Sequence, residues 1–314
     1  MKKVLIIGST CLDIASWVDQ LPRGNEDIHP QRTEYRVSGS GWCMANAFRM
    51  LNMPYDLISP VGTGVYSETV RQMAQEYGII LKNREETAGC TYTLIDPEGN
   101  TGMMMVGGSE YSFSVNDIPD FDPEDYAWIL LSGTQFEQDP QTLLGFVQSA
   151  EIPVIFQPGG RSVLMNEQLM KQIYDLHPVL HINEAEASYL CEGRAADLNE
   201  AAQYLCSLTE APVIILLNDM RCLCFDGEEE YLIEPQNHDR VDLSGSMEGH
   251  AAAWTIARCS GLNMRKALEF AEAYAETVSV TDETIPDQTE ENRLRQQLAG
   301  MILSSDYRNA LKTK

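Results

Sequence analysis

The sequence predicts an α/β protein in which helices cover both faces of a mostly parallel central sheet. The first observation is that short apolar runs alternate with segments of helical periodicity along most of the chain. The second is that these runs are almost entirely apolar, as strands buried on both faces must be. The third is that two polar stretches with strand patterns interrupt the alternation, and they predict a small additional β region.

The apolar runs and the helical segments define the order of the expected elements. Core strands are expected at Val4–Ile7, Trp128–Leu131, Val154–Phe156, Val179–Ile182 and Val213–Leu217. Apolar residues recur at helical spacing between them, which predicts helices at Glu68–Tyr77, Gln141–Ala150, Glu167–Leu176 and Leu198–Leu208. The acidic turn at residues 226–230 predicts a hairpin, and the C-terminal segment predicts one amphipathic helix with a polar tail.

Two interruptions of this alternation predict the small β region. Residues 13–37 are polar and extended, with alternation over residues 32–37. Residues 90–106 have the pattern of a hairpin with a turn at Asp96-Pro97-Glu98-Gly99-Asn100. Because such inserted strands cannot easily join a parallel core, we expect a single domain over residues 1–314 with a discontinuous β lid, residues 13–37 and about 90–110. The lid is expected to cover the carboxyl edge of the sheet, where α/β proteins bind ligands.

The charge balance excludes some classes of partner. The chain has 22 Lys and Arg against 47 Asp and Glu, a formal net charge of −25. A protein that grips nucleic acid needs Lys or Arg at each phosphate, and docking onto anionic lipid needs a basic surface. No apolar run approaches the roughly 20 residues of a membrane span, and the N-terminal segment lacks the long apolar centre of a secretion signal. We therefore expect a cytoplasmic protein with a solvated acidic surface and neither a nucleic-acid nor a membrane partner.

The cysteines and histidines do not predict a metal site from their spacing. The eight cysteines are scattered, without a Cys-x-x-Cys pair or a Cys/His cluster at zinc spacing. Reduced, mostly buried thiols are the expected state in a cytosolic protein. His177 and His181 flank the entry to a strand rather than one helix face, which disfavours a metal site between them.

Common phosphate-binding and nucleophile loops are absent from the sequence. The first strand leads into Gly8-Ser9-Thr10-Cys11 rather than G-x-G-x-x-G, no Gly-Lys-Ser/Thr follows a strand, and no G-x-S-x-G occurs. Residues 241–254 are more informative, because small residues lead into an Ala-rich helix with Glu248 in its first turn. Backbone N–H groups and the positive end of the helix converge there. Amides that hold a phosphate beside a proton-accepting carboxylate suit phosphoryl transfer to a hydroxyl. An ordinary helix start with a favourable acidic residue explains the same pattern.

The same segment resembles the signature of the ribokinase-like (PfkB) carbohydrate kinases. Their Asp-Thr-Thr-Gly-Ala-Gly-Asp corresponds to Asp242-Leu243-Ser244-Gly245-Ser246-Met247-Glu248. Other similar blocks follow in the family's order over nearly the whole chain, at residues 8–13, 38–45, 60–66, 156–161 and 183–186. Residues 62–68 and 247–250 are most similar to an uncharacterised sugar kinase branch of this family.

The resemblance implies a fold, an activity and a set of partners. The implied fold is a ribokinase-like three-layer α/β/α sandwich with a small β lid. The implied activity is ATP-dependent phosphorylation of a hydroxyl on a sugar, a small polyol or a nucleoside. The implied cofactors are ATP and Mg2+, often with a monovalent cation (K+), and the implied assembly is a homodimer formed through the lid.

The resemblance also implies the roles of the catalytic residues. Glu248 stands in the place of the catalytic base. The amides of Gly245, Ser246 and Met247 are expected to bind the transferring phosphate, and Arg161 is expected to neutralise phosphate charge.

Other positions in the matching blocks are implied to bind the substrate, the nucleotide and the metal. Substrate contacts are implied for Asp13, Gly39 and Cys43, and cofactor contacts for Asn183, Glu186 and Asn218, with Glu186 also organising Mg2+. Simpler explanations exist for single residues. Asp13 suits a turn cap, Arg161 a surface ion pair, and Asn183 with Glu186 a helix capping box.

Several family positions are altered, and two functions therefore stay open. Glu248 replaces an Asp, which adds a methylene and moves the carboxyl oxygens by about 1.5 Å unless the rotamer compensates, and a misplacement of about 1 Å can cost about a hundredfold in rate. Met247 replaces a Gly, Cys43 an Asn, and Gln157 an Asp. The first hypothesis is an active kinase. The alternative is a catalytically impaired protein of the same fold that binds a sugar or nucleotide as a regulator. A nucleotide-dependent oxidoreductase is disfavoured by the missing Gly-rich loop.

Overall fold

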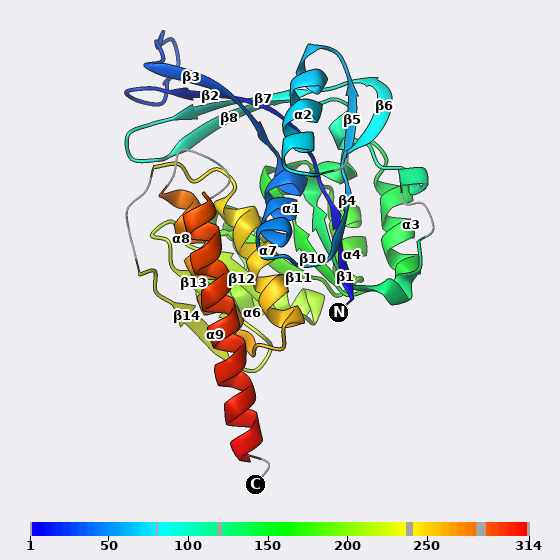
Figure 1. Ribbon diagram of the computed structural model, residues 1–314, viewed down its shortest axis with the longest axis vertical. Helices are drawn as coiled ribbons and strands as arrows, with labels where there is room; N and C mark the ends of the chain where they lie inside the picture. The colour runs from blue at the N-terminus through cyan, green and yellow to red at the C-terminus, as the bar shows by residue number, and fades with distance from the viewer. Residues whose placement is uncertain (1, 80, 118–120, 237–240, 281–286, 313–314) are drawn as a thin grey trace.

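The computed structural model shows a three-layer α/β/α arrangement around a mostly parallel sheet (Figure 1). It describes residues 1–314 except residues 1, 80, 118–120, 237–240, 281–286 and 313–314. The predicted fold class is confirmed. The predicted core strands and helices are also present, with ends that differ from the expected ones by one to three residues.

The central sheet contains eight strands in the order β14-β13-β12-β11-β10-β9-β1-β4. Their bounds are β1 (Lys3–Ile7), β4 (Tyr55–Ile58), β9 (Tyr126–Ser132), β10 (Val154–Gln157), β11 (Val179–Asn183), β12 (Val213–Leu216), β13 (Cys222–Phe225) and β14 (Glu230–Ile233). Neighbours from β4 to β12 pair in parallel. The pairs β12–β13 and β13–β14 are antiparallel, the second of them being the hairpin expected at the acidic turn.

Helices cover the sheet on both faces. The helices of the described residues are α1 (Ser40–Met50), α2 (Val65–Glu76), α3 (Pro140–Ala150), α4 (Glu167–Tyr174), α5 (Glu184–Cys191), α6 (Leu198–Thr209), α7 (Ser246–Cys259), α8 (Met264–Ser279) and α9 (Gln288–Lys312). Short 3-10 helices are η1 (Ser109–Tyr111), η2 (Val115–Asp117), η3 (Pro123–Asp125), η4 (Gly133–Phe136) and η5 (Gly159–Leu164).

Two hydrophobic cores lie on the two sides of the central sheet. Along β1, Val4 and Ile6 pack into the core that contains α1, α7 and α8, whereas Leu5 and Ile7 pack into the core that contains α3, α5 and α6. Successive side chains of a strand point to opposite faces, so a strand covered on both faces must be apolar at every position. This is the physical reason for the continuous apolar runs in the sequence.

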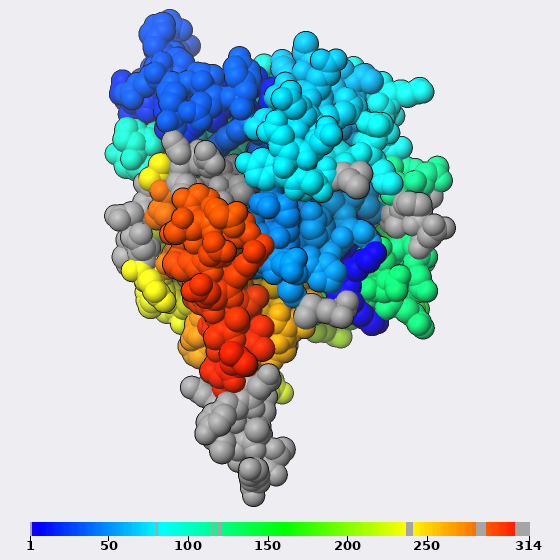
Figure 2. Space-filling model, viewed as in Figure 1, coloured from blue at the N-terminus to red at the C-terminus, as the bar shows by residue number. Residues whose placement is uncertain are grey.

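A small sheet, formed by strands β3, β2, β7 and β8 in that order, lies at one end of the molecule. Its strands are β2 (Cys11–Trp17), β3 (Arg32–Ser38), β7 (Cys90–Ile95) and β8 (Thr101–Val106). Two stretches far apart in the sequence meet through the parallel pair β2–β7. Figure 2 shows the residues of β2 and β3, together with α2, at this end, beyond α8 and α9.

A third, two-stranded sheet had no counterpart in the sequence pattern. It pairs β5 (Pro60–Thr63) with β6 (Lys82–Thr87). The sequence of β6 is Lys-Asn-Arg-Glu-Glu-Thr and the strand is mostly exposed, so no apolar alternation marks it. Among the described residues, no helix is long and apolar enough to cross a membrane.

Candidate functional site

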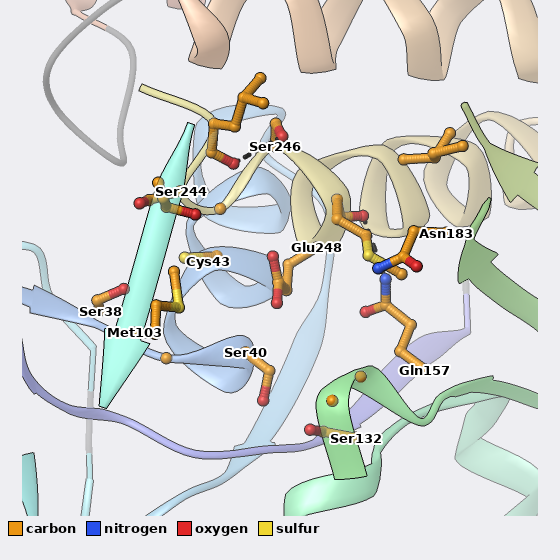
Figure 3. A pocket seen from close by; sticks show the side chains of 18 of the residues that line it. Ser38, Ser40, Cys43, Met103, Ser132, Gln157, Asn183, Ser244, Ser246 and Glu248 are labelled. Carbon is orange, nitrogen blue, oxygen red and sulfur yellow. Dashed lines mark hydrogen bonds between the residues drawn. The ribbon is translucent and has the colours of Figure 1, made fainter. Parts of the chain in front are cut away.

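A cavity of about 790 Å3 lies between the central sheet and the small sheet, large enough for a drug-sized ligand. The carboxyl ends of the core strands form its floor through Ser132, Gln157, Asn183 and Leu216. The small sheet forms the facing wall through Thr91, Thr93, Thr101, Met103 and Met105. Figure 3 shows Glu248 pointing into this space from α7, with Cys43, Ser40 and Gln157 around it.

The start of α7 presents backbone amides to the cavity. Gly245 precedes the helix with φ 80°, a left-handed conformation suited to glycine, and no side chain caps the first turn. The hydroxyl of Ser246 instead donates to the carbonyl oxygen of Leu243 at 2.8 Å. First-turn N–H groups have no carbonyl partner within their own helix, so the amide of Met247 is placed to hold an anion.

Met247 has ordinary helical geometry. It is the second residue of α7 and is absent from the residues with positive φ. Its Cβ therefore causes no backbone strain, although the family pattern has glycine at this position. The change from glycine to methionine therefore affects the cavity only by adding a side chain, since Met247 lines the cavity.

We expect Met247→Gly to have a small effect on any ATP-dependent rate, less than about tenfold, because the backbone amide stays in place. The free energy of unfolding should fall by up to about 1 kcal/mol, the cost of glycine inside a helix. Denaturant unfolding measures the free energy, and release of ADP measures the rate. A gain of tenfold or more in rate would contradict the assignment of unstrained geometry.

Three carboxyl groups line the cavity, those of Glu186, Glu248 and Glu272. Burial raises the pKa of Glu248, against the opposing effect of a hydrogen bond from its own backbone amide. Burial, together with the charge of Glu248, raises the pKa of Glu186 to about 7, although the backbone amide of Asn183 opposes the shift. A nearby positive charge favours the ionised form of such carboxyl groups.

Asn183 and Glu186 form a complete capping box at the start of α5. The side chain of Asn183 accepts a hydrogen bond from the amide of Glu186 at 2.9 Å, and Glu186 accepts one from the amide of Asn183 at 3.1 Å. The simple capping explanation is therefore correct for this pair. It does not remove the pair from the cavity, which both residues line.

Asp13 is not among the residues that line the cavity. It is 1 % exposed, and its two carboxyl oxygens accept hydrogen bonds from Thr93 at 2.6 Å and from Arg36 at 2.9 Å. The guanidinium of Arg36 also donates to Asp242 at 2.6 Å. Asp13 therefore lies behind the cavity wall that the small sheet forms. Thr93 lines the cavity and donates its hydroxyl to Asp13, so it links Asp13 to the cavity.

Gly39 and Cys43 do line the cavity. Gly39 precedes α1 with φ 110°, and a Cβ at this position would lie 2.5 Å from the carbonyl oxygen of Ser9, so only glycine fits. Burial, with a smaller contribution from the charge of Glu248, raises the pKa of the Cys43 thiol well above its usual value. Cys43 therefore offers a neutral thiol to the cavity.

Arg161 and Asn218 lie at the edges of the cavity. Arg161, from η5, donates to the hydroxyl of Tyr111 at 2.8 Å and forms an ion pair with Glu137 at 2.5 Å. Its charge is therefore shared with a carboxylate. The backbone amide of Asn218 donates to Glu184 at 2.6 Å.

Three residues near the cavity were not predicted as functional from the sequence: Arg36, Thr93 and Glu272. Arg36 and Thr93 surround Asp13, and Glu272 lines the cavity from α8. Arg36 belongs to a polar, alternating stretch, and that pattern does not reveal that its side chain is buried. Its partner Asp242 is 206 residues away. No local pattern marks such a pair.

Comparisons with known proteins identify a family for this chain. The model of the pfkB family carbohydrate kinase matches residues 1–290. An uncharacterised sugar kinase of Escherichia coli, YegV, is 22% identical over 283 residues, which is 88% of each chain.

Solved structures are also similar in fold. Arabidopsis thaliana ribokinase, complexed with ribose and ATP, has a TM-score of 0.73 at 20% identity and covers 94% of this chain and 98% of its own. The Burkholderia thailandensis nucleoside kinase in complex with inosine has a TM-score of 0.76 at 14% identity. It covers 94% of this chain and 98% of its own.

Proposed function

Because the chain belongs to the pfkB family of carbohydrate kinases, we propose that it transfers the γ-phosphoryl group of ATP to a hydroxyl of a sugar, a small polyol or a nucleoside. Related proteins support this range of acceptors, since one is named a sugar kinase and others are complexed with ribose and ATP or with inosine. The observation that carries the proposal is the position of Glu248, whose carboxyl lies in the cavity beside the first-turn amides of its own helix.

In the proposed reaction, Glu248 takes the proton of the acceptor hydroxyl. The hydroxyl oxygen forms a bond to the γ-phosphorus while the bond between that phosphorus and the β–γ bridging oxygen breaks, and ADP leaves. The amides of Gly245, Ser246 and Met247 are proposed to face the charge that develops on the transferred phosphoryl group. Arg161 at the edge of the cavity adds positive charge, which Glu137 partly offsets.

The longer side chain of Glu248 is compatible with the role of an Asp. Its side chain points into the cavity from the first turn of α7, and the choice of rotamer can offset the added methylene. Burial raises its pKa, which makes the carboxylate a stronger proton acceptor.

The donor set fits Mg2+, which prefers oxygen ligands and keeps several waters. Glu186 is proposed to hold the ion through water, with Asn183 fixing the carboxylate by the capping box. When bound, Mg2+ neutralises charge on the ATP phosphates. Asn218 is proposed to lie beside the nucleotide. Gly39 and Cys43 are proposed to contact the acceptor, and Asp13 is proposed to act on it through the hydroxyl of Thr93.

The small sheet is proposed to act as the lid and as a dimer contact. β8 is an edge strand, and Met104 and Val106 on it are 58% and 49% exposed. Alternation along the strand directs them away from Met103 and Met105, which line the cavity.

We expect Met104→Lys to shift the protein from dimer to monomer in analytical ultracentrifugation, because a charge at an apolar interface is costly. A wild-type chain that sediments as a monomer would remove this part of the proposal.

Release of ADP tests the proposed function directly. The purified protein is mixed with Mg-ATP and a panel of sugars, polyols and nucleosides, and turnover of at least one compound is expected. Measurable ATP binding without turnover of any compound would instead support the regulator.

A further inference from the structure

A group of buried polar side chains lies where β13, α7 and α8 meet. Cys222 of β13, His250 of α7 and Glu272 of α8 each offer one ligand atom, and these atoms all lie within 4.8 Å of one another. Cys222 and His250 are 0% exposed and Glu272 is 4% exposed. The three residues come from separate segments, so the spacing of cysteines and histidines in the sequence does not indicate them.

Two polar atoms of this cluster are buried without a hydrogen-bond partner among the described residues. They are Nε2 of His250 and Oε2 of Glu272. They face each other at 3.6 Å, which is beyond hydrogen-bond distance. Buried polar atoms almost always have a partner, and an ion is one explanation when they do not.

From this arrangement we propose that Cys222, His250 and Glu272 bind one divalent transition-metal ion of the Zn2+ class. Ligand atoms at zinc distances in a tetrahedral site lie about 3.3–3.7 Å apart, and the His250–Glu272 separation of 3.6 Å matches this range. The Sγ atom of Cys222 lies within 4.8 Å of both other ligand atoms. Thiolate and imidazole ligands favour Zn2+, Co2+ and related ions over Mg2+, so this ion is distinct from the one that accompanies ATP.

A divalent cation must displace protons from this cluster. Burial raises the pKa of Glu272 to about 8, and the charge of Glu276 adds to the shift. Burial, with the charge of Glu272, raises the pKa of the Cys222 thiol well above its usual value. A divalent ion with one thiolate and one carboxylate has no net charge. Its binding releases the proton of Cys222 and, where Glu272 is protonated, a second proton.

A second layer of contacts holds the imidazole of His250. Its Nδ1 lies 2.8 Å from Nε2 of His181, and Nδ1 of His181 lies 3.0 Å from the side-chain amide of Gln157. A histidine that binds metal through Nε2 donates from Nδ1, so His181 then accepts at Nε2 and carries its proton on Nδ1. This arrangement requires Gln157 to turn its side-chain oxygen toward His181. Gln157 and Glu272 both line the cavity, which provides the entry path. The ion thereby joins β13, α7 and α8.

The same contacts allow an arrangement without metal. In it the amide of Gln157 donates to His181, His181 donates to His250, and Nε2–H of His250 points toward Glu272. The experiment must therefore separate a metal site from a chain of hydrogen bonds. Metal content does so, because only the first arrangement predicts a stoichiometric ion bound through sulfur.

The test uses tag-free full-length protein, stripped with a chelator and then exposed to Zn2+ or Co2+ in excess Mg2+. We expect one Zn2+ per chain by mass spectrometry of metal content, and a thiolate-to-cobalt charge-transfer band with Co2+. Cys222→Ser should remove the band and weaken Zn2+ binding at least tenfold, and Glu272→Gln should weaken it as well. Cys224→Ser is the matched control, because Cys224 lies on the same strand and is equally buried.

Absence of the cobalt band in the wild-type protein would overturn the proposal whether or not the variants fold. Equal Zn2+ affinity of Cys222→Ser and Cys224→Ser would overturn it too. Nucleotide and acceptor are left out of the assay, so its result does not depend on kinase activity. A protein that turns over substrate but binds no Zn2+ refutes the metal site alone, and a protein that binds Zn2+ but turns over no acceptor refutes the proposed kinase function alone.

Discussion

Glu248→Ala and Glu248→Gln are expected to lower the rate of ADP formation by about 100- to 10,000-fold, the usual contribution of a positioned general base. Glu248→Asp is expected to retain or raise the rate. Asp keeps the carboxylate and has the side-chain length of the family signature that this segment resembles. The measurement is the initial rate of ADP release with Mg-ATP and whichever acceptor the wild-type protein turns over.

The matched control is Glu269→Gln, which neutralises an exposed carboxylate on α8. It should leave the rate within about twofold, since surface substitutions away from a site have small effects. ATP binding by the Glu248 variants should persist, because the phosphate-binding amides belong to the backbone. Equal rates for the Ala, Asp and wild-type proteins would exclude Glu248 from the mechanism.

Arg36→Met is expected to lower the free energy of unfolding by about 3–5 kcal/mol, the cost of leaving buried carboxylates without their partner. Arg36 donates to Asp13 at 2.9 Å and to Asp242 at 2.6 Å, and these side chains are 2% and 1% exposed. Asp242 in turn accepts from the amide of Ser244 at 2.8 Å, so the substitution also loosens the loop that leads into α7. Denaturant unfolding measures the stability, and ADP release is expected to fall with it.

The effect of Arg36→Met should grow as the pH rises. Burial raises the pKa of Asp13 even with Arg36 in place. A carboxyl whose folded-state pKa is raised favours folding at low pH and loses that contribution as the pH rises through the folded pKa. Removing the guanidinium raises this pKa further. The difference in unfolding free energy between wild type and variant should therefore be smaller at about pH 5 than at about pH 8.

Arg32→Met provides the control for this prediction. Arg32 lies on the same strand, pairs with the exposed Glu34 at 3.2 Å and stacks over Trp17. Exposed ion pairs and exposed cation–π contacts are each worth about 1 kcal/mol or less. A loss of stability as large as that of Arg36→Met, or a loss for Arg36→Met that does not change with pH, would contradict the argument.

The sequence predicted the order of the core elements because each of them has a local, repeating signal. The continuous apolar run Val4–Ile7 requires packing on both faces, and the two cores of the structure receive alternate residues of this strand. The exposed strand β6 has no such signal and was missed. The site was predicted in part: Gly39, Cys43, Arg161, Asn183, Glu186, Asn218 and Glu248 line one cavity, as do Gly245, Ser246 and Met247.

The sequence by itself determined the α/β class, the position of the helix that begins at Ser246 and the carboxylate in its first turn, because periodicity and small-residue runs are local properties. Only the tertiary structure decided that Arg36 joins Asp13 to Asp242, that Asp13 lies beneath the cavity wall, and that Cys222, His250 and Glu272 meet. These contacts join strands and helices that are distant along the chain. Their energies depend on burial and on distances between side-chain atoms, and neither has a repeating pattern in the sequence.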